Sequence, residues 1–160
     1  VAENFHARYA AHAKTYHYYL LNTRVDDPFL FDTCHRIWPA LDLAAMQAAA
    51  AKFVGTHDFS ALCASGSSAA AHGDTVRTIT DCTVVQIGDL FTISVTADGY
   101  LYNMARILAG TLVQAGLHKR TPDSIPSLLE SRDRKQAGPT LPAKGLFLER
   151  VDYPGLDAIS

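Results

Sequence analysis

A long β-hairpin is the sequence feature that most constrains the fold. The segments TVRTITDCTVVQI (75–87) and LFTISVTA (90–97) flank Gly88-Asp89, which is suited to a tight turn between two strands. In the second segment Phe91, Ile93, Val95 and Ala97 alternate with Leu90, Thr92, Ser94 and Thr96. A period of two predicts a strand with one buried face and one more polar face.

Further strands and amphipathic helices are predicted around the hairpin. KTYHYYLLN (14–22) and GLFLERVDY (145–153) have strand patterns. Helices are predicted from Asp42, as N-cap, to Gly55, from just after a turn at Asp98-Gly99 to about Gly116, and from Ser124 to Arg134. The segment after the first strand, as far as Pro39, is predicted to be irregular, and ASGSSAAAHG (64–73) to be a mobile loop.

The order β-α-β-β-α-(α)-β is that of a split βαβ fold. It predicts an α+β, ferredoxin-like domain: a four-stranded antiparallel sheet with helices on one face and the other face free for a ligand or partner. With 160 residues, of which 48% are hydrophobic, residues 1–160 are expected to form a single domain.

Composition argues against several classes of protein. A net charge of −2 gives no bulk signal for nucleic-acid binding, although the first 24 residues hold a local basic cluster: His6, Arg8, His12, Lys14, His17 and Arg24.

The three cysteines are far apart and form no C-x-x-C pair, so no disulfide framework is expected and a reducing cytoplasm fits best. No apolar run is long enough to span a membrane. The N-terminus is polar from its third residue, unlike a signal peptide, and begins with Val1, as expected of a fragment.

Motifs for metal, phosphate or nucleophilic chemistry are absent from the sequence. The seven histidines show no H-E-x-x-H or i, i+4 pair, and no glycine-rich phosphate loop or G-x-S-x-G occurs. Asp58 adjoins His57 in GTHDF, but neighbours on a strand point to opposite faces, so a structural turn is expected there. Neither a metal site nor a cofactor is predicted.

Tyrosines on the first predicted strand could have either of two roles. Lys14, Tyr16, Tyr18 and Leu20 share one face of this strand, and Thr15, His17, Tyr19 and Leu21 share the other. Aromatic side chains on an open sheet face stack unpaired bases in RNA-binding proteins. Tyrosines with this pattern also occur as half-buried core residues with their hydroxyls at the edge, and the strand pattern alone favours that interpretation.

Arg106 is an unusual charge in the apolar segment DGYLYNMARILAG. A helical projection predicts a core stripe of Leu101, Met104, Ala105, Leu108, Leu112 and Ala115. Arg106 falls at the margin of this stripe, beside Tyr102 and Gly110, and Gly110 leaves room for another backbone or a ligand. The guanidinium could extend to water, or it could hold a carboxylate or phosphate in a partly desolvated cleft.

Five segments, in this order, resemble the TruA family of tRNA pseudouridine synthases. They are FHARYAAHAKTYHYYLLN, GTHDFSAL, TVRTI, DGYLYNMARILAGTLVQAG and RDRKQAGPTLPAKGLFLERVDYP, and they cover about residues 5–154. The resemblance implies a cofactor-independent isomerase that converts uridine to pseudouridine in the anticodon stem-loop of tRNA. It also implies a homodimer whose subunits contain two similar halves with the active-site cleft between them.

The resemblance implies roles for particular residues. Tyr16 in KTYHY matches the tyrosine that stacks on the target base, Arg106 in YNMARI the arginine that pairs with the catalytic aspartate, and Leu146 in AKGLFL an apolar residue of the uridine pocket. We also expect Arg8, Lys14 and Arg77 to contact the RNA.

One motif of the family does not occur in the chain. Its nucleophilic aspartate belongs to R-T-D-x-G-V-H-A, and TVRTITD spaces Arg77 and Asp81 wrongly for this motif. The chain is therefore predicted to be the C-terminal half of such an enzyme, inactive without the N-terminal half. The alternatives are a stand-alone RNA-binding module of RRM-like fold, although LFTISVTA lacks the aromatic motif of that class, and a structural or dimerising domain.

Overall fold

The computed structural model describes residues 11–154 and contains the four strands predicted from the sequence. They are β1 (Ala13–Asn22), β4 (Val76–Ile87), β5 (Leu90–Ala97) and β6 (Leu146–Asp152). β1 pairs antiparallel with β5 along one edge and with β6 along the other, and β4 pairs antiparallel with β5. These four strands therefore lie in the order β6-β1-β5-β4.

Two further short strands make the sheet mixed and six-stranded, rather than four-stranded and antiparallel as predicted. β2 (His35–Ile37) runs parallel to the end of β1, and β3 (Gly55–Asp58) runs antiparallel to the start of β4. The segment before Pro39 is thus not wholly irregular, and GTHDF is not the expected turn. Strands of three or four residues are too short to show a clear period of two. Their conformation depends on pairing with the neighbouring strand, which the local sequence does not reveal.

Helices α2 (Leu43–Phe53) and α5 (Ser124–Ser131) match predicted helices but end earlier. Asp42 is the N-cap of α2, as predicted, and its carboxylate accepts a hydrogen bond from the Ala45 amide at 3.1 Å. Helix α5 is terminated by its C-cap Arg132, whose φ of 53° is left-handed. Within the predicted loop 64–73, Ser68–Ala71 forms the one-turn helix α3.

Helix α4 (Met104–Gly116) begins four residues later than Tyr100, the residue that follows the predicted Asp98-Gly99 turn. Asp98 instead extends the hairpin pairing: its carboxylate accepts from the Thr78 amide, and its amide donates to the Thr78 carbonyl. All residues of α4 except Arg106 and Gln114 are buried. The sequence predicted one apolar stripe, but the segment 137–146 covers a second side of the helix.

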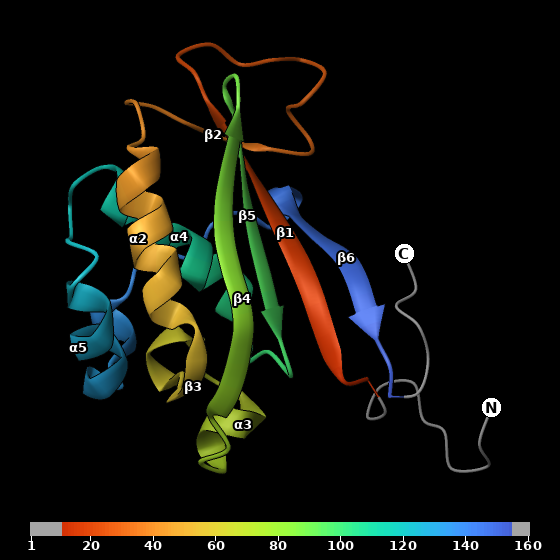
Figure 1. The fold of residues 1–160 in the computed structure, drawn as a ribbon, viewed down its shortest axis with the longest axis vertical. Coiled ribbons are helices and arrows are strands. Elements are labelled where there is room, and N and C mark those ends of the chain that lie inside the picture. Colours follow the sequence, from red (N-terminus) through yellow and green to blue (C-terminus); the bar gives the residue numbers. More distant parts are fainter. Residues whose placement is uncertain (1–10, 155–160) are drawn as a thin grey trace.

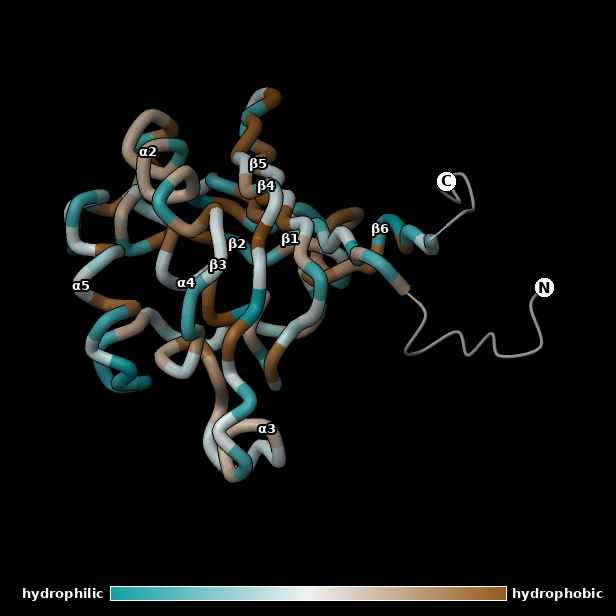
Figure 2. Tube along the Cα trace, turned by 60° about the horizontal axis from the view of Figure 1, so that its bottom comes forward, coloured by the Kyte–Doolittle hydropathy of each residue, from teal (hydrophilic) through white to brown (hydrophobic). Residues whose placement is uncertain are grey.

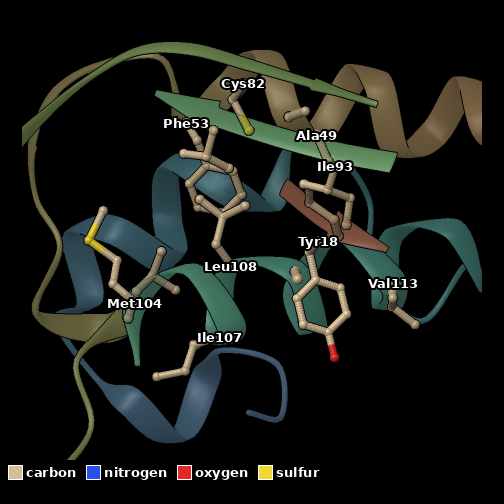
Figure 3. Packing of buried hydrophobic residues seen from close by; sticks show 14 of the residues in the cluster. Tyr18, Ala49, Phe53, Cys82, Ile93, Met104, Ile107, Leu108 and Val113 are labelled. Carbon is tan, nitrogen blue, oxygen red and sulfur yellow. The ribbon is translucent and has the colours of Figure 1, made fainter. Parts of the chain in front are cut away.

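Helices α2, α4 and α5 gather on one side of the strands (Figure 1). Hydrophobic and hydrophilic stretches follow one another along β4 (Figure 2), and its buried residues Ile79, Cys82 and Val84 contribute to the core. Figure 3 shows Phe53 of α2 and Leu108 of α4 packed against the strands that carry Cys82 and Ile93. Within residues 11–154 no helix combines the length and apolarity that crossing a membrane requires.

Candidate functional site

Tyr16, Arg106 and Leu146, which are far apart in the sequence, line one small pocket. Its volume is about 140 Å³, and Tyr100, Leu101, Asn103, Met104 and Ala105 complete the lining. Tyr16 comes from β1, Leu146 begins β6, and Arg106 lies in the first turn of α4. The fold thus brings together the three residues whose roles the family resemblance implies.

Strand pairing places Tyr16 next to Leu146. β6 runs antiparallel to β1, with Tyr18 opposite Leu146 and Tyr16 opposite Leu148. Side chains two residues apart on one strand point to the same face. Leu146 therefore lies on the same side of the sheet as Tyr16, under the start of α4.

Arg106 is held by two hydrogen bonds at the margin of the pocket. Its Nε donates to the Leu141 carbonyl at 2.7 Å, and its Nη1 donates to Asn103 Oδ1 at 3.1 Å. The side chain is partly buried, so it does not simply extend to water. Among residues 11–154 no carboxylate forms an ion pair with it. The guanidinium therefore retains capacity to bind an anion.

Two glycines allow the backbone of the segment 138–146 to lie directly on α4. A Cβ atom at Gly110 would overlap the Pro139 carbonyl oxygen, and one at Gly138 would lie 2.5 Å from the Thr111 amide nitrogen. The Gly138 amide donates to Thr111 Oγ1 at 3.0 Å. The sequence left open whether a backbone or a ligand approaches Gly110, and the structure shows a backbone.

A third glycine places the end of this segment beside β1. A Cβ atom at Gly145 would lie 2.7 Å from Cζ of Tyr18. The Tyr18 hydroxyl also donates to the Pro142 carbonyl at 2.6 Å. Because Leu146 follows Gly145 directly, these contacts fix its position in the pocket.

Tyr100 and Asn103 are pocket residues that the sequence analysis did not identify. The Tyr100 hydroxyl lies 2.8 Å from the carbonyl oxygens of both Lys14 and Val95, which share its single proton. Its ring meets that of Tyr16 edge to face, with centroids 4.9 Å apart, and burial raises the pKa of Tyr100. Both residues fall in a stretch predicted to be helical. Because they precede α4, a helical projection does not describe the directions of their side chains.

Tyr18 of β1 is a core residue and does not belong to an open stacking surface. Tyr18 is 2% exposed, Leu20 is fully buried, and burial raises the pKa of Tyr18. Tyr18 and Leu20 share with Tyr16 the face of β1 that the helices cover. Tyr16 lines the pocket on this face. The core interpretation is therefore correct for Tyr18, and the base-stacking surface considered from the sequence is wrong for it.

The other predicted RNA-contacting residues lie outside this pocket or outside the described residues. Lys14 precedes Tyr16 by two residues on the same face of β1 but does not line the pocket. Arg77 lies on β4, where it bonds Asp74 and packs near Gly99. Arg8 falls in residues 1–10, which are outside the described part of the chain.

Asp58 participates in a hydrogen-bond network away from the pocket. Its carboxylate accepts from the hydroxyls of Ser60 and Thr75, and Arg132 Nε lies 3.4 Å away. Burial alone would raise the pKa of Asp58, but these groups lower it. The network connects β3 to neighbouring elements. Across residues 11–154 no three histidine, cysteine or acidic side chains are grouped so that they could hold a metal ion.

Comparison with known proteins identifies the family. The profile of a family described as tRNA pseudouridine synthase matches residues 49–154, which include Arg106 and Leu146. The chain is also 45% identical to tRNA pseudouridine synthase A of Acetivibrio thermocellus over 94% of its length. The chain belongs to the TruA family of tRNA pseudouridine synthases.

Other TruA relatives match to a similar extent. Identity is 45% to tRNA pseudouridine synthase A of Moorella thermoacetica and 43% to that of Shouchella clausii, each over 96% of this chain. The chain spans 60%, 61% and 58% of the Acetivibrio, Moorella and Shouchella proteins, respectively. The part of this chain that aligns with these relatives therefore includes the residues that line the pocket.

Proposed function

We propose that this chain forms the C-terminal part of a TruA active site, which converts uridine to pseudouridine in a tRNA anticodon stem-loop. The observation that carries the proposal is the convergence of Tyr16, Arg106 and Leu146 on one pocket of a chain that belongs to this family. In the proposed site Tyr16 stacks on the target base, Leu146 packs against it, and Arg106 pairs with the reacting aspartate.

The reaction is an isomerisation that needs neither an oxidant nor a cofactor. The bond between ribose C1′ and uracil N1 breaks, the base rotates, and a bond forms between C1′ and C5. The proton on C5 is lost and N1 gains one, so atoms balance. The target base must leave its stack, and an aromatic ring helps to offset the unstacking cost of a few kcal/mol.

Arg106 has a specific chemical task in this scheme. An aspartate acting as nucleophile in a dry pocket has to remain ionised, and a nearby guanidinium lowers a carboxyl pKa by about 1 to 3 units. The partly buried Arg106 already has two of its N–H groups bonded to the protein, which fixes its orientation. Lysine at this position would present a point charge in place of a planar fork.

The reacting aspartate is proposed to come from an N-terminal half that precedes these residues. The motif R-T-D-x-G-V-H-A does not occur in the 160 residues, and the relatives are longer than the chain. The order β6-β1-β5-β4, with α2 and α4 as connections, supports a ferredoxin-like half of the two-half fold. In this proposal the isolated chain is inactive, and the complete enzyme is a homodimer.

The test compares two arginine variants in the complete polypeptide that carries this sequence. Turnover is followed as tritium released from C5 of labelled uridine in a tRNA anticodon arm. Arg106→Lys is expected to lose most activity. Arg134→Lys is the control, because Arg134 bonds Gly138 and Thr140 of the same segment but does not line the pocket. Near-normal turnover by Arg106→Lys would refute the role proposed for Arg106. RNA binding by the isolated chain, without turnover by the complete polypeptide, would favour a binding module.

A further inference from the structure

The two hydrogen bonds of Arg106 leave a defined set of donors free. A guanidinium carries five N–H groups. Nε donates to the Leu141 carbonyl, and one Nη1 hydrogen is used by Asn103 Oδ1. No acceptor for the second Nη1 hydrogen or for the two on Nη2 is found within residues 11–154. Within this part of the chain three hydrogens therefore remain free, one on Nη1 and two on Nη2.

Asn103 has a backbone conformation that few residues adopt. Its φ of 60° and ψ of 12° are left-handed, a region that non-glycine residues visit mainly as asparagine, aspartate or histidine. The Asn103 carbonyl accepts the first helical bond of α4 from the Ile107 amide at 2.9 Å. This conformation directs its side chain along the first turn of the helix, toward Arg106.

The Asn103 side chain also forgoes the usual capping bond. An asparagine at the N-cap normally accepts from a backbone amide in the first helical turn. Here no such bond forms, and within residues 11–154 the side-chain oxygen accepts only from Arg106 Nη1. Asn103 Oδ1 thus accepts from the Arg106 guanidinium and not from the helix backbone.

We propose that Asn103 is a positioning residue, which turns the Arg106 fork so that Nη1 and Nη2 face the pocket and receive a carboxylate end-on. Side-on binding would need Nε, and Leu141 already occupies that donor. Leu141 and Asn103 hold the guanidinium at two points, and the covalent bond to Cδ supplies a third point in the same plane, so the plane of the group is fixed. This inference rests on the proposed function, because the carboxylate it orients is that of the reacting aspartate.

Loss of the Asn103 acceptor leaves the guanidinium attached only through Nε. The planar group can then turn about its hydrogen bond to the Leu141 carbonyl. The N–H groups of Nη1 and Nη2 no longer stay aligned with the pocket. A misplacement of about 1 Å in a reacting group costs about 100-fold in rate. For Asn103→Gly we expect kcat to fall about 10- to 100-fold, with KM for the tRNA anticodon arm within about twofold of the parent value.

The matched control is His118→Gly. His118 is also left-handed, with φ 58°, and lies at the other end of α4, outside the pocket. Glycine adopts left-handed backbone without strain, so both variants keep the helix ends. In the complete polypeptide His118→Gly should keep the parent kcat. Parent-like kcat in Asn103→Gly would overturn the proposal.

A second measurement is independent of turnover. In the 160-residue chain, nitrogen–proton spectra should show resolved Nη signals for a guanidinium held at two points. Asn103→Gly should merge the Arg106 Nη signals through faster rotation, whereas His118→Gly should not. Unchanged Arg106 signals in Asn103→Gly would overturn the proposal. If the complete parent polypeptide makes no pseudouridine, the proposed function fails, and these spectra alone decide whether Asn103 orients Arg106.

Discussion

Substitution of Gly110 by alanine tests two opposite effects on stability: the higher helix propensity of alanine and its steric overlap with the backbone packed on α4. In an exposed helix interior, Gly→Ala stabilises a protein by about 1 kcal/mol. At Gly110 the new methyl group would overlap the Pro139 carbonyl oxygen and lie 3.0 Å from its carbonyl carbon and 3.3 Å from its Cδ. These backbone and ring atoms cannot rotate aside, so the segment 138–141 has to move away from α4.

That movement determines the size of the expected effect. Overpacking costs about 1 to 3 kcal/mol, and the displaced segment also weakens the bonds from Gly138 to Thr111 and from Arg106 to Leu141, at about 1 kcal/mol each. After the gain in helix propensity, the free energy of unfolding should fall by about 2 to 4 kcal/mol.

The assay is urea unfolding of the 160-residue chain followed by circular dichroism. Gly99→Ala is the control, because a Cβ there meets only the flexible Arg77 side chain, at 3.2 and 3.3 Å. It should change stability by less than about 0.5 kcal/mol. The midpoint for Gly110→Ala should fall clearly below both the parent and the control. A midpoint equal to or above that of the parent would refute the reasoning from backbone contact.

Two further predictions concern ionisable groups outside the pocket. Burial alone would raise the pKa of Asp58, but the hydroxyls of Ser60 and Thr75 lower it. Its stabilising contribution is therefore fully present above the unfolded-state pKa of about 4 and is lost as pH falls through the lower folded-state pKa. Asp58→Asn should cost about 2 kcal/mol at pH 7, and thermal unfolding at several pH values should show the difference shrinking in acid; a difference that persists below pH 2 contradicts this. Burial also raises the pKa of Cys82 to about 12. Iodoacetamide at pH 8 should label Cys82 only in the urea-unfolded chain, as read by peptide mass spectrometry, and rapid labelling of the native chain would contradict its burial.

Elements with local signals were predictable from the sequence. The hairpin follows from alternation around Gly88-Asp89, and the start of α2 follows from the capping chemistry of Asp42. β2 and β3 were missed because their conformation depends on pairing with β1 and β4. The start of α4 was misplaced because Tyr100 and Leu101 fit a helical period, while the left-handed backbone of Asn103 prevents the helix from extending through them.

The candidate site was predictable to a different degree. Tyr16, Arg106 and Leu146 were identified through the family resemblance, and no pattern of spacing alone could bring them together. The roles of Tyr100 and Asn103 depend on side-chain directions at an irregular turn between β5 and α4. Periodicity describes regular elements, so it gives no information about such a turn.

The contact between Gly110 and Pro139 also restricts how the pocket can change shape. With no side chain between the two backbones, the segment carrying Leu141 and Leu146 cannot slide along α4 without steric overlap. In the proposed active site, this part of the pocket would therefore have its final form before a substrate arrives. Any change of shape that accompanies the entry of a base into the proposed site would then involve pocket residues outside this segment.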